Sequence, residues 1–189
     1  NMLMDSQSLD DWKDLYSKLI YWELELDKSA DKSMNEVYEN QKKEANHNFS
    51  KFISKNYITY LQPTGDNGPV MSHNLFRRKV KQHIDEKVPV FFILIDNLRL
   101  DQWKTIAPIL KERFKIEEED QYLTILPTTT QYCRNAIFSG LLPSEIEKRF
   151  PDKWSNDEDE GGKNNFEEDF FKDMLQRLQI KGKNSYTKV

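Results

Sequence analysis

The run of apolar residues from Val88 to Ile95 limits the fold of this chain more than any other segment. It is interrupted only by Pro89 and is too short for a helix that crosses a bilayer. A short run of this kind, rich in β-branched and aromatic residues, is typical of a strand buried on both faces of a parallel sheet. The run ends at Asp96, and open α/β sheets bind their ligands at the carboxyl ends of such strands.

A second apolar run, from Tyr122 to Leu126, repeats the pattern and is followed by Pro127 and three consecutive threonines. The two runs predict two buried strands whose ends bring an acid, Asp96, and a hydroxyl to the same edge of a sheet. Between the runs, residues 97–114 form a predicted turn and then place apolar residues at helical spacing. This order of strand, helix and strand is typical of an α/β fold.

The N-terminal third of the chain carries the pattern of two helices. Ser8 and Asp11 have the spacing of a capping box, and apolar residues then recur at intervals of three, four or seven. Ser33 and Glu36 have the same spacing ahead of a second helical pattern that ends near Leu61. We expect an antiparallel helical hairpin, whose apolar stripe fits either core packing or the docking surface of an interaction module.

A cluster of turn-forming residues, PTGDNGP at 63–69, separates this hairpin from the rest of the chain. We therefore predict a helical linker or signalling region over residues 1–68 and a sheet domain over residues 69–189. A third helix is expected over about 73–86, with a basic run from Arg77 to Lys81. That run fits a solvated face that balances acidic neighbours, contact with phosphate, or direct DNA binding.

The composition limits the class of protein. The net charge of −4 and a pI of about 5.5 argue against a chain devoted to gripping a nucleic-acid backbone. Cys133 is the only cysteine, which excludes an internal disulfide framework and a cysteine-rich zinc site and fits a reducing compartment. With no predicted membrane helix and no signal peptide pattern, we expect a cytoplasmic protein without membrane contact.

The polar residues after the two predicted strands each have a structural and a chemical interpretation. Asp96 fits a helix cap, or a ligand for a divalent cation that Arg99 orients. The threonines at 128–130 include a candidate N-cap for the helix expected over 131–139, and a candidate nucleophile that metal coordination would activate. Cys133 is expected to be a small buried side chain rather than a reactive thiol.

Two segments together resemble the PglZ domain of the alkaline phosphatase superfamily: IDNLR at 95–99 and LPTTTQYCRNAIFSGLLP at 126–143. Within that likeness the chain is most similar to PorX-like response regulators, in which a receiver domain, a helical linker and a PglZ domain follow one another. These regulators are associated with type IX secretion. The resemblance implies an alkaline-phosphatase-like, mostly parallel sheet flanked by helices, present as a partial domain and preceded by an all-α linker.

The resemblance also implies a two-metal phosphoester hydrolase that depends on zinc. Its interval between a Pro-Thr-x-Thr segment and a Gly-Leu-x-Pro segment selects Thr130 as the nucleophile and metal ligand, and Asp96 matches the first metal-binding aspartate. Phosphodiesters such as oligonucleotides are the implied substrates. Arg99 and Asn135 are candidate substrate-binding residues through phosphate oxygens, with salt bridging or helix capping as the alternative for each.

The chain departs from the family pattern in its ligands, because no histidine follows His83 while the family's remaining Asp and His ligands lie downstream of the matching region. We therefore expect an incomplete metal site, and a chain that is inactive or nearly so by itself. The alternative function is a non-catalytic regulatory module for homodimerisation or partner binding. Its partners would be a receiver domain and secretion-regulating proteins.

Residues 151–165, PDKWSNDEDEGGKNN, form an acidic segment that contains two glycines. Its composition predicts a mobile surface loop. The alternative is a lid over the substrate, in which Trp154 offers a stacking surface. An amphipathic helix is expected to follow over residues 166–178.

Overall fold

The structure, a computed structural model, describes residues 8–29, 33–62, 67–84, 88–156 and 162–188. The chain divides into two compact units. Unit 1 comprises Asn1–Pro69 and Leu98–Gln121, and unit 2 comprises Val70–Asn97 and Tyr122–Val189. The boundary predicted between residues 68 and 69 stays a prediction. The segment 98–121 belongs to unit 1, although the residues before and after it in the sequence belong to unit 2.

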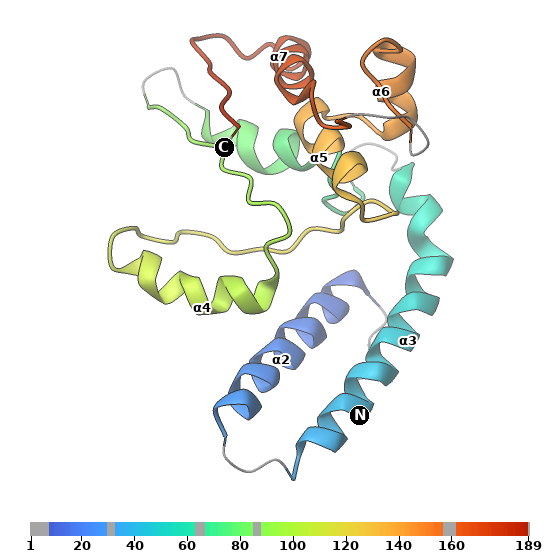
Figure 1. Cartoon of the computed structure of the whole chain (residues 1–189), viewed down its shortest axis with the longest axis vertical. Helices are drawn as coiled ribbons and strands as arrows, with labels where there is room; N and C mark the ends of the chain where they lie inside the picture. The colour runs from blue at the N-terminus through green and yellow to red at the C-terminus, as the bar shows by residue number, and fades with distance from the viewer. Residues whose placement is uncertain (1–7, 30–32, 63–66, 85–87, 157–161, 189) are drawn as a thin grey trace. The chain divides into compact units, whose positions relative to one another are not determined.

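Unit 1 begins with the predicted helical hairpin, formed by α2 (Leu9–Lys28) and α3 (Asn35–Leu61) and seen side by side in Figure 1. The capping box at the start of α2 is present, because the Asp11 amide donates to Ser8 Oγ at 3.2 Å and the Ser8 amide donates to Asp11 Oδ2 at 2.8 Å. The N-cap residue of α3 is Met34, which makes no side-chain cap bond, in place of the predicted Ser33.

The apolar stripe of the hairpin is core. Trp12, Leu15 and Ala45 are buried against one another, and the Trp12 ring lies 5.4 Å from the Phe49 ring, centroid to centroid. The Tyr38 hydroxyl also donates to the Leu19 carbonyl at 3.0 Å, which ties α3 to α2. Core packing is therefore one use of the stripe.

Helix α4 (Leu100–Lys111) completes unit 1, and the segment after it lies along α2. Asp120 pairs with Lys13 at 3.4 Å, and Gln121 Nε2 donates to Ser17 Oγ at 2.6 Å. These contacts explain why a segment placed between two predicted strands packs with the helical hairpin.

The described residues of unit 2 form five short helical elements. A π-helix, η1 (Phe76–Val80), and a 3-10 turn, η2 (Lys81–His83), occupy the place of the third predicted helix. The helices α5 (Thr130–Ser139), α6 (Pro143–Arg149) and α7 (Glu167–Arg177) follow. The predictions of helices over 131–139 and 166–178 are therefore confirmed to within one residue at their ends.

The core of unit 2 forms where α7 packs on α5 and η1. Phe76, Met174 and Leu175 are its buried centre. Gly140 ends α5 with a φ of 64°, and a Cβ at this position would lie 2.8 Å from Met174 Sδ. Glycine meets both demands, because it accepts the left-handed conformation and leaves room for α7. The partly buried hydrophobic residues packed against this centre are Val80, Ile84, Phe92, Phe171, Leu178 and Ile180.

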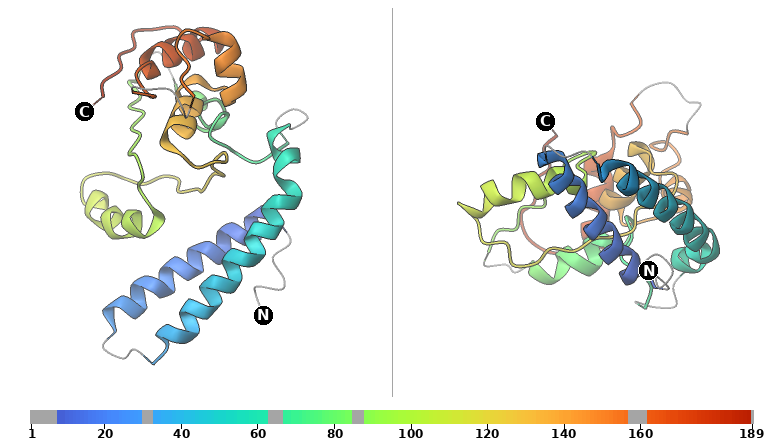
Figure 2. Two further views of the ribbon diagram at one scale, coloured as in Figure 1. Left: turned by 45° about the vertical axis from the view of Figure 1, so that its right-hand side comes forward. Right: turned by 90° about the horizontal axis from the view of Figure 1, so that it is seen from below.

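The predicted parallel sheet is wrong for this structure. Among the described residues, no run of strand residues forms, and Met71 and Leu123 make an isolated parallel bridge. Residues 88–97 run as an extended trace outside any helix (Figure 2). Phe91 is 85% exposed and Ile93 is 77% exposed, so this segment is not buried on both faces.

The physical reason for the difference lies in what a buried strand requires. A central parallel strand needs hydrogen-bonded strands at both edges and cover on both faces. Phe92 packs on the core of unit 2 while its neighbours point outward, which gives the segment one covered face. The strand was predicted from apolar content alone. Among the described residues, no neighbouring strand forms a ladder of hydrogen bonds with this segment.

None of the helices among the described residues combines the length and the apolar content that crossing a membrane requires.

Candidate functional site

Thr130 is the first residue of α5 and is exposed, like Thr128 and Thr129 before it. Thr129 is the N-cap residue with extended backbone angles, but its side chain makes no cap hydrogen bond. The N-terminal amides of α5 therefore receive no side-chain acceptor from the N-cap residue. The N-terminus of a helix favours a nearby negative charge.

Asp96 stands at the end of the extended segment, just before Asn97, whose φ of 56° turns the chain. Its carboxylate is 46% exposed and lies 3.8 Å from Arg134, measured from Oδ2 to Nη1. Arg134 belongs to α5, and the charge of Asp96 also acts on Cys133 of the same helix. The structure thus brings Asp96 against the first half of the helix that Thr130 begins.

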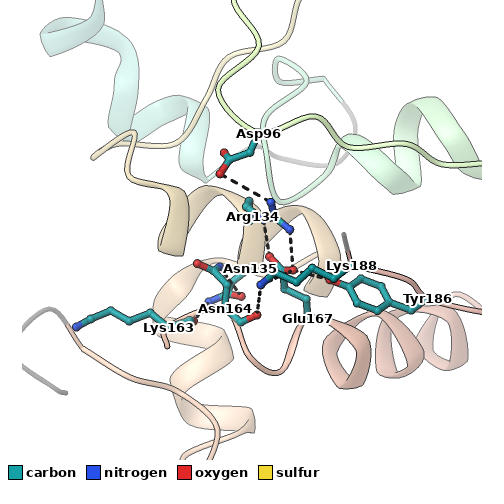
Figure 3. A network of polar contacts seen from close by, with 8 residues as sticks. All are labelled: Asp96, Arg134, Asn135, Lys163, Asn164, Glu167, Tyr186 and Lys188. Carbon is teal, nitrogen blue, oxygen red and sulfur yellow. Dashed lines mark hydrogen bonds and ion pairs between the residues drawn. The ribbon is translucent and has the colours of Figure 1, made fainter. Parts of the chain in front are cut away.

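Arg134 is the centre of a polar network that joins α5 to α7 (Figure 3). Its Nε donates to Glu167 Oε1 at 2.6 Å and its Nη2 donates to Glu167 Oε2 at 2.8 Å. The Glu167 side chain is only 1% exposed, whereas that of Arg134 is 16% exposed. A carboxylate so deeply buried requires a charged partner, and the two-bond geometry supplies one with a fixed orientation.

The C-terminal segment adds two further contacts to Glu167. The Tyr186 hydroxyl donates to Glu167 Oε2 at 2.6 Å, and Lys188 Nζ lies 3.7 Å from the same oxygen. Burial, followed by the hydrogen bond to Glu167, raises the pKa of Tyr186 to about 12, so this hydroxyl keeps its proton at neutral pH. Glu167 therefore accepts from a neutral phenol as well as from the guanidinium.

Cys133 lies half-buried in α5, with its Sγ 3.6 Å from the Ile125 carbonyl oxygen. Burial, and then the charge of Asp96, raises the pKa of this thiol to about 11. Reactive cysteines have a lowered thiol pKa, so the structure agrees with the prediction of an unreactive side chain.

The other two predicted site residues, Asn135 and Arg99, make polar contacts within their own units. Asn135 is buried at the side of α5 that faces residues 163–164, where its Nδ2 donates to the Lys163 carbonyl at 3.0 Å and its Oδ1 accepts from Asn164 Nδ2 at 3.2 Å. Arg99 belongs to unit 1, where it caps α4 and pairs with Asp101 at 2.8 Å. Their role in substrate binding stays a prediction.

The predicted lid residue, Trp154, stacks against Tyr132 of α5 with ring centroids 5.8 Å apart. Its indole Nε1 also donates to Asn156 Oδ1 at 2.9 Å. Residues 157–161 of the proposed lid lie outside the described residues. Whether Trp154 stacks on a substrate stays a prediction, and in this structure its ring has an aromatic partner from the protein itself.

The described residues do not fit a complete metal site. No group of three or more His, Cys, Asp or Glu side chains among them is arranged to hold an ion. Catalytic zinc sites use three protein ligands, and the candidates in this region are Asp96 and Thr130. Whether the ligand set of this chain is incomplete stays a prediction.

The sequence analysis named Asp96 and Asn135 of this network but missed Arg134, Glu167 and Tyr186. Arg134 follows Thr130 by four positions, which places both on one face of a helix, so helical spacing from the predicted nucleophile would have indicated it. Glu167 and Tyr186 carry no such signal, because only tertiary packing brings them to α5. A buried glutamate is also hard to foresee, since Glu is among the residues least often buried.

Comparison with protein families gave two matches. Residues 1–61 match the linker domain of the PorX response regulator. Residues 75–187 match the alkaline phosphatase-like PglZ domain of the BREX system. No curated protein is similar enough to be matched. The two matched segments follow one another in the order that the sequence resemblance implied.

Proposed function

Because the chain belongs to the PglZ alkaline phosphatase-like family, we propose that it contributes the nucleophile and part of the catalytic site of a phosphoester hydrolase. The match of residues 1–61 to the PorX linker domain makes it a PorX-like regulator in domain content. The proposed substrates are phosphodiesters, with oligonucleotides as the leading class.

The observation that carries this proposal is the position of Asp96 against α5. The ion pair to Arg134 and the effect of Asp96 on the Cys133 thiol both place the carboxylate beside the helix that begins with Thr130. An acid and an exposed hydroxyl in one region of unit 2 are the parts that covalent phosphoryl transfer needs.

In the proposed reaction, Thr130 Oγ1 attacks phosphorus and the bond from phosphorus to the leaving oxygen breaks. The threonine is then linked to a phosphoryl group that keeps the second ester group of the diester. Water then attacks that phosphorus and releases the threonine. A threonine hydroxyl is a weak nucleophile at neutral pH, so its proton must be drawn off. Coordination of the hydroxyl to a divalent ion would do this, and Asp96 is proposed to help hold that ion. The positive end of the α5 dipole, at the N-terminus that Thr130 begins, would favour the negative charge of the phosphoryl group.

Two zinc ions are proposed as cofactors on the family likeness alone. Asp96 and Thr130 are the ligands that this chain would contribute. Because the described residues do not fit a complete metal site, the proposal assigns further ligands to other parts of the natural protein, and the isolated 189 residues are expected to be inactive or nearly so.

The test compares Thr130→Val with Thr129→Val in the natural protein that contains this chain. Both threonines are exposed and adjacent, and the Thr129 side chain makes no cap hydrogen bond, so the second variant is a matched control. Hydrolysis of a chromogenic phosphodiester and of a dinucleotide is followed at increasing zinc concentration.

Loss of the nucleophile is expected to lower kcat by at least about 100-fold in Thr130→Val, in line with other catalytic groups that act in the transition state. Thr129→Val should stay within about threefold of wild type, because surface changes away from such groups are close to neutral. Equal activities of the two variants would rule out Thr130 as the nucleophile.

A second candidate function is a regulatory module for dimerisation or partner binding. The observation that favours it is the exposure of large apolar side chains on the hairpin, where Tyr21 and Trp22 are each 57% exposed and Ile58 is 65% exposed. Such side chains in a matched linker domain fit a docking surface. Under a purely regulatory role, Thr130→Val would leave regulatory output unchanged.

The regulatory context proposed for the protein is a cytoplasmic two-component pathway that controls type IX secretion. A receiver domain and secretion-regulating proteins would be its partners. Reporter expression of secretion genes in cells that carry Thr130→Val or Trp22→Ser separates the two functions. If only Thr130→Val alters reporter expression, hydrolysis is the function that controls secretion. If only Trp22→Ser alters it, docking is that function.

A further inference from the structure

The Arg134 guanidinium is hydrogen-bonded to Glu167 along one edge, while Nη1 on the other edge makes no hydrogen bond among the described residues. Nε and Nη2 both donate to Glu167, at 2.6 and 2.8 Å. Nη1 faces Asp96 at 3.8 Å, a separation too long for a hydrogen bond. Among the described residues, then, the hydrogen-bonding capacity of Nη1 remains available beside the proposed site.

We propose that Nη1 of Arg134 binds a non-bridging oxygen of the phosphoryl group that Thr130 attacks, an inference that rests on the proposed hydrolase function. Arg134 follows Thr130 by one helical turn, so the two residues share a face of α5. Side chains of a helix lean toward its N-terminus, which directs Arg134 toward the turn that Thr130 occupies.

Glu167 and Tyr186 give this arginine the rigidity that a recognition residue requires. The two hydrogen bonds to Glu167 fix the plane of the guanidinium, and the Tyr186 hydroxyl holds the carboxylate at 2.6 Å (Figure 3). Arginine suits this task because its planar fork serves a carboxylate and a phosphate at the same time. Glu167 is itself too deeply buried to contact substrate, so it acts as a positioning residue.

Asp96 does not exclude this role. Its side chain is 46% exposed, and its contact with Arg134 is an ion pair of 3.8 Å. A phosphoryl oxygen at Nη1 therefore competes with this weak partner rather than with a hydrogen bond. The competing interpretation is that Arg134 is structural only and joins α5 to α7 through Glu167. The two interpretations differ in whether loss of the guanidinium weakens anion binding.

The test uses inorganic phosphate as the probe, measured in the natural protein by isothermal titration and as a competitive inhibitor of diester hydrolysis. The variants are Arg134→Lys, Arg134→Gln and the pair Arg134→Gln with Glu167→Gln, which removes both charges and leaves no uncompensated buried carboxylate. Arg149→Gln is the matched control, because Arg149 also pairs side-on with a carboxylate of α7, Asp173, at 2.6 Å.

The expected result is a roughly 10- to 100-fold rise in the phosphate dissociation constant and inhibition constant for Arg134→Gln and for the double variant, the size expected for one charged hydrogen bond. Arg134→Lys should fall between these and wild type. Arg149→Gln should bind phosphate like wild type. If the double variant folds and binds phosphate as tightly as Arg149→Gln, the role of Arg134 in anion binding is overturned.

The outcomes also separate this inference from the proposed function. Hydrolysis that depends on Thr130 together with phosphate inhibition that is unaffected by Arg134 would overturn the inference alone. Phosphate binding that depends on Arg134 without any hydrolysis would leave an anion site and overturn the hydrolase. A wild-type protein that neither binds phosphate nor hydrolyses a diester would overturn both.

Discussion

Substitution of Glu167 by glutamine should destabilise unit 2 strongly. The carboxylate is 1% exposed and accepts three short hydrogen bonds, two from Arg134 and one from Tyr186. A glutamine at this position keeps one acceptor oxygen and loses the charge. Arg134, whose side chain is 16% exposed, would then be left with Asp96 at 3.8 Å as its remaining anionic partner.

Breaking a buried ion pair from one side costs about 3–5 kcal/mol of folding free energy. Because Arg134 keeps some access to water and a distant partner, we expect Glu167→Gln to lie near the lower end, at about 3 kcal/mol. The measurement is urea unfolding followed by circular dichroism, with hydrogen exchange of α5 and α7 amides to report on unit 2 by itself.

The neighbouring Glu168→Gln is the control. It changes the same charge in the same first turn of α7, but Glu168 is exposed and pairs with an exposed Lys172. Its free energy of unfolding should stay close to that of wild type. If Glu167→Gln and Glu168→Gln unfold at the same urea concentration, the network around Arg134 does not hold α7 to α5.

Two further predictions concern other parts of unit 2. Gly140→Ala should lower the free energy of unfolding by about 2–3 kcal/mol, since alanine is strained at a φ of 64° and its Cβ would lie 2.8 Å from the buried Met174 Sδ. The control is Gly182→Ala, at a φ of 118° with no atom within 4 Å of the added Cβ, which should cost only the backbone strain. Equal urea midpoints for the two variants would contradict this prediction. Burial, partly opposed by Glu145, lowers the pKa of His73 below its usual 6.5, and its buried Nδ1 has no hydrogen-bond partner. The unfolded chain therefore binds the proton more readily than the folded chain, so the free energy of unfolding should fall as the pH drops below about 6.5. His73→Leu should weaken this pH dependence, whereas the control His47→Gln, at an exposed histidine, should leave it unchanged. Denaturant titrations at several pH values measure both.

Local sequence patterns predicted several helices of this chain but gave no indication of α6. The spacing of Ser8 and Asp11 predicted a capping box that the structure contains, and the helical period predicted α5 and α7. These elements depend on interactions between residues close in sequence, which is why sequence alone suffices.

The presence of a sheet could not be predicted from local patterns, because each strand of a sheet needs neighbouring strands from distant parts of the sequence. The run that contains Phe91 and Ile93 has the composition of a buried strand, yet composition does not tell whether other strands lie beside it. The same limit applies to the site. Asp96 and Thr130 were predicted from motifs, whereas Glu167 comes to Arg134 through the packing of α7 on α5.

The central claim is that Thr130 forms a covalent bond to phosphorus, and trapping that intermediate tests it most directly. The natural protein is mixed with a phosphodiester, quenched in acid within a fraction of a turnover, digested and analysed by mass spectrometry. We predict a phosphoryl group on the peptide that contains Thr130, still esterified to the part of the diester that does not leave. This adduct should be absent from Thr130→Val and retained in Thr129→Val. Turnover without any such adduct, or an adduct on another residue, would contradict the claim.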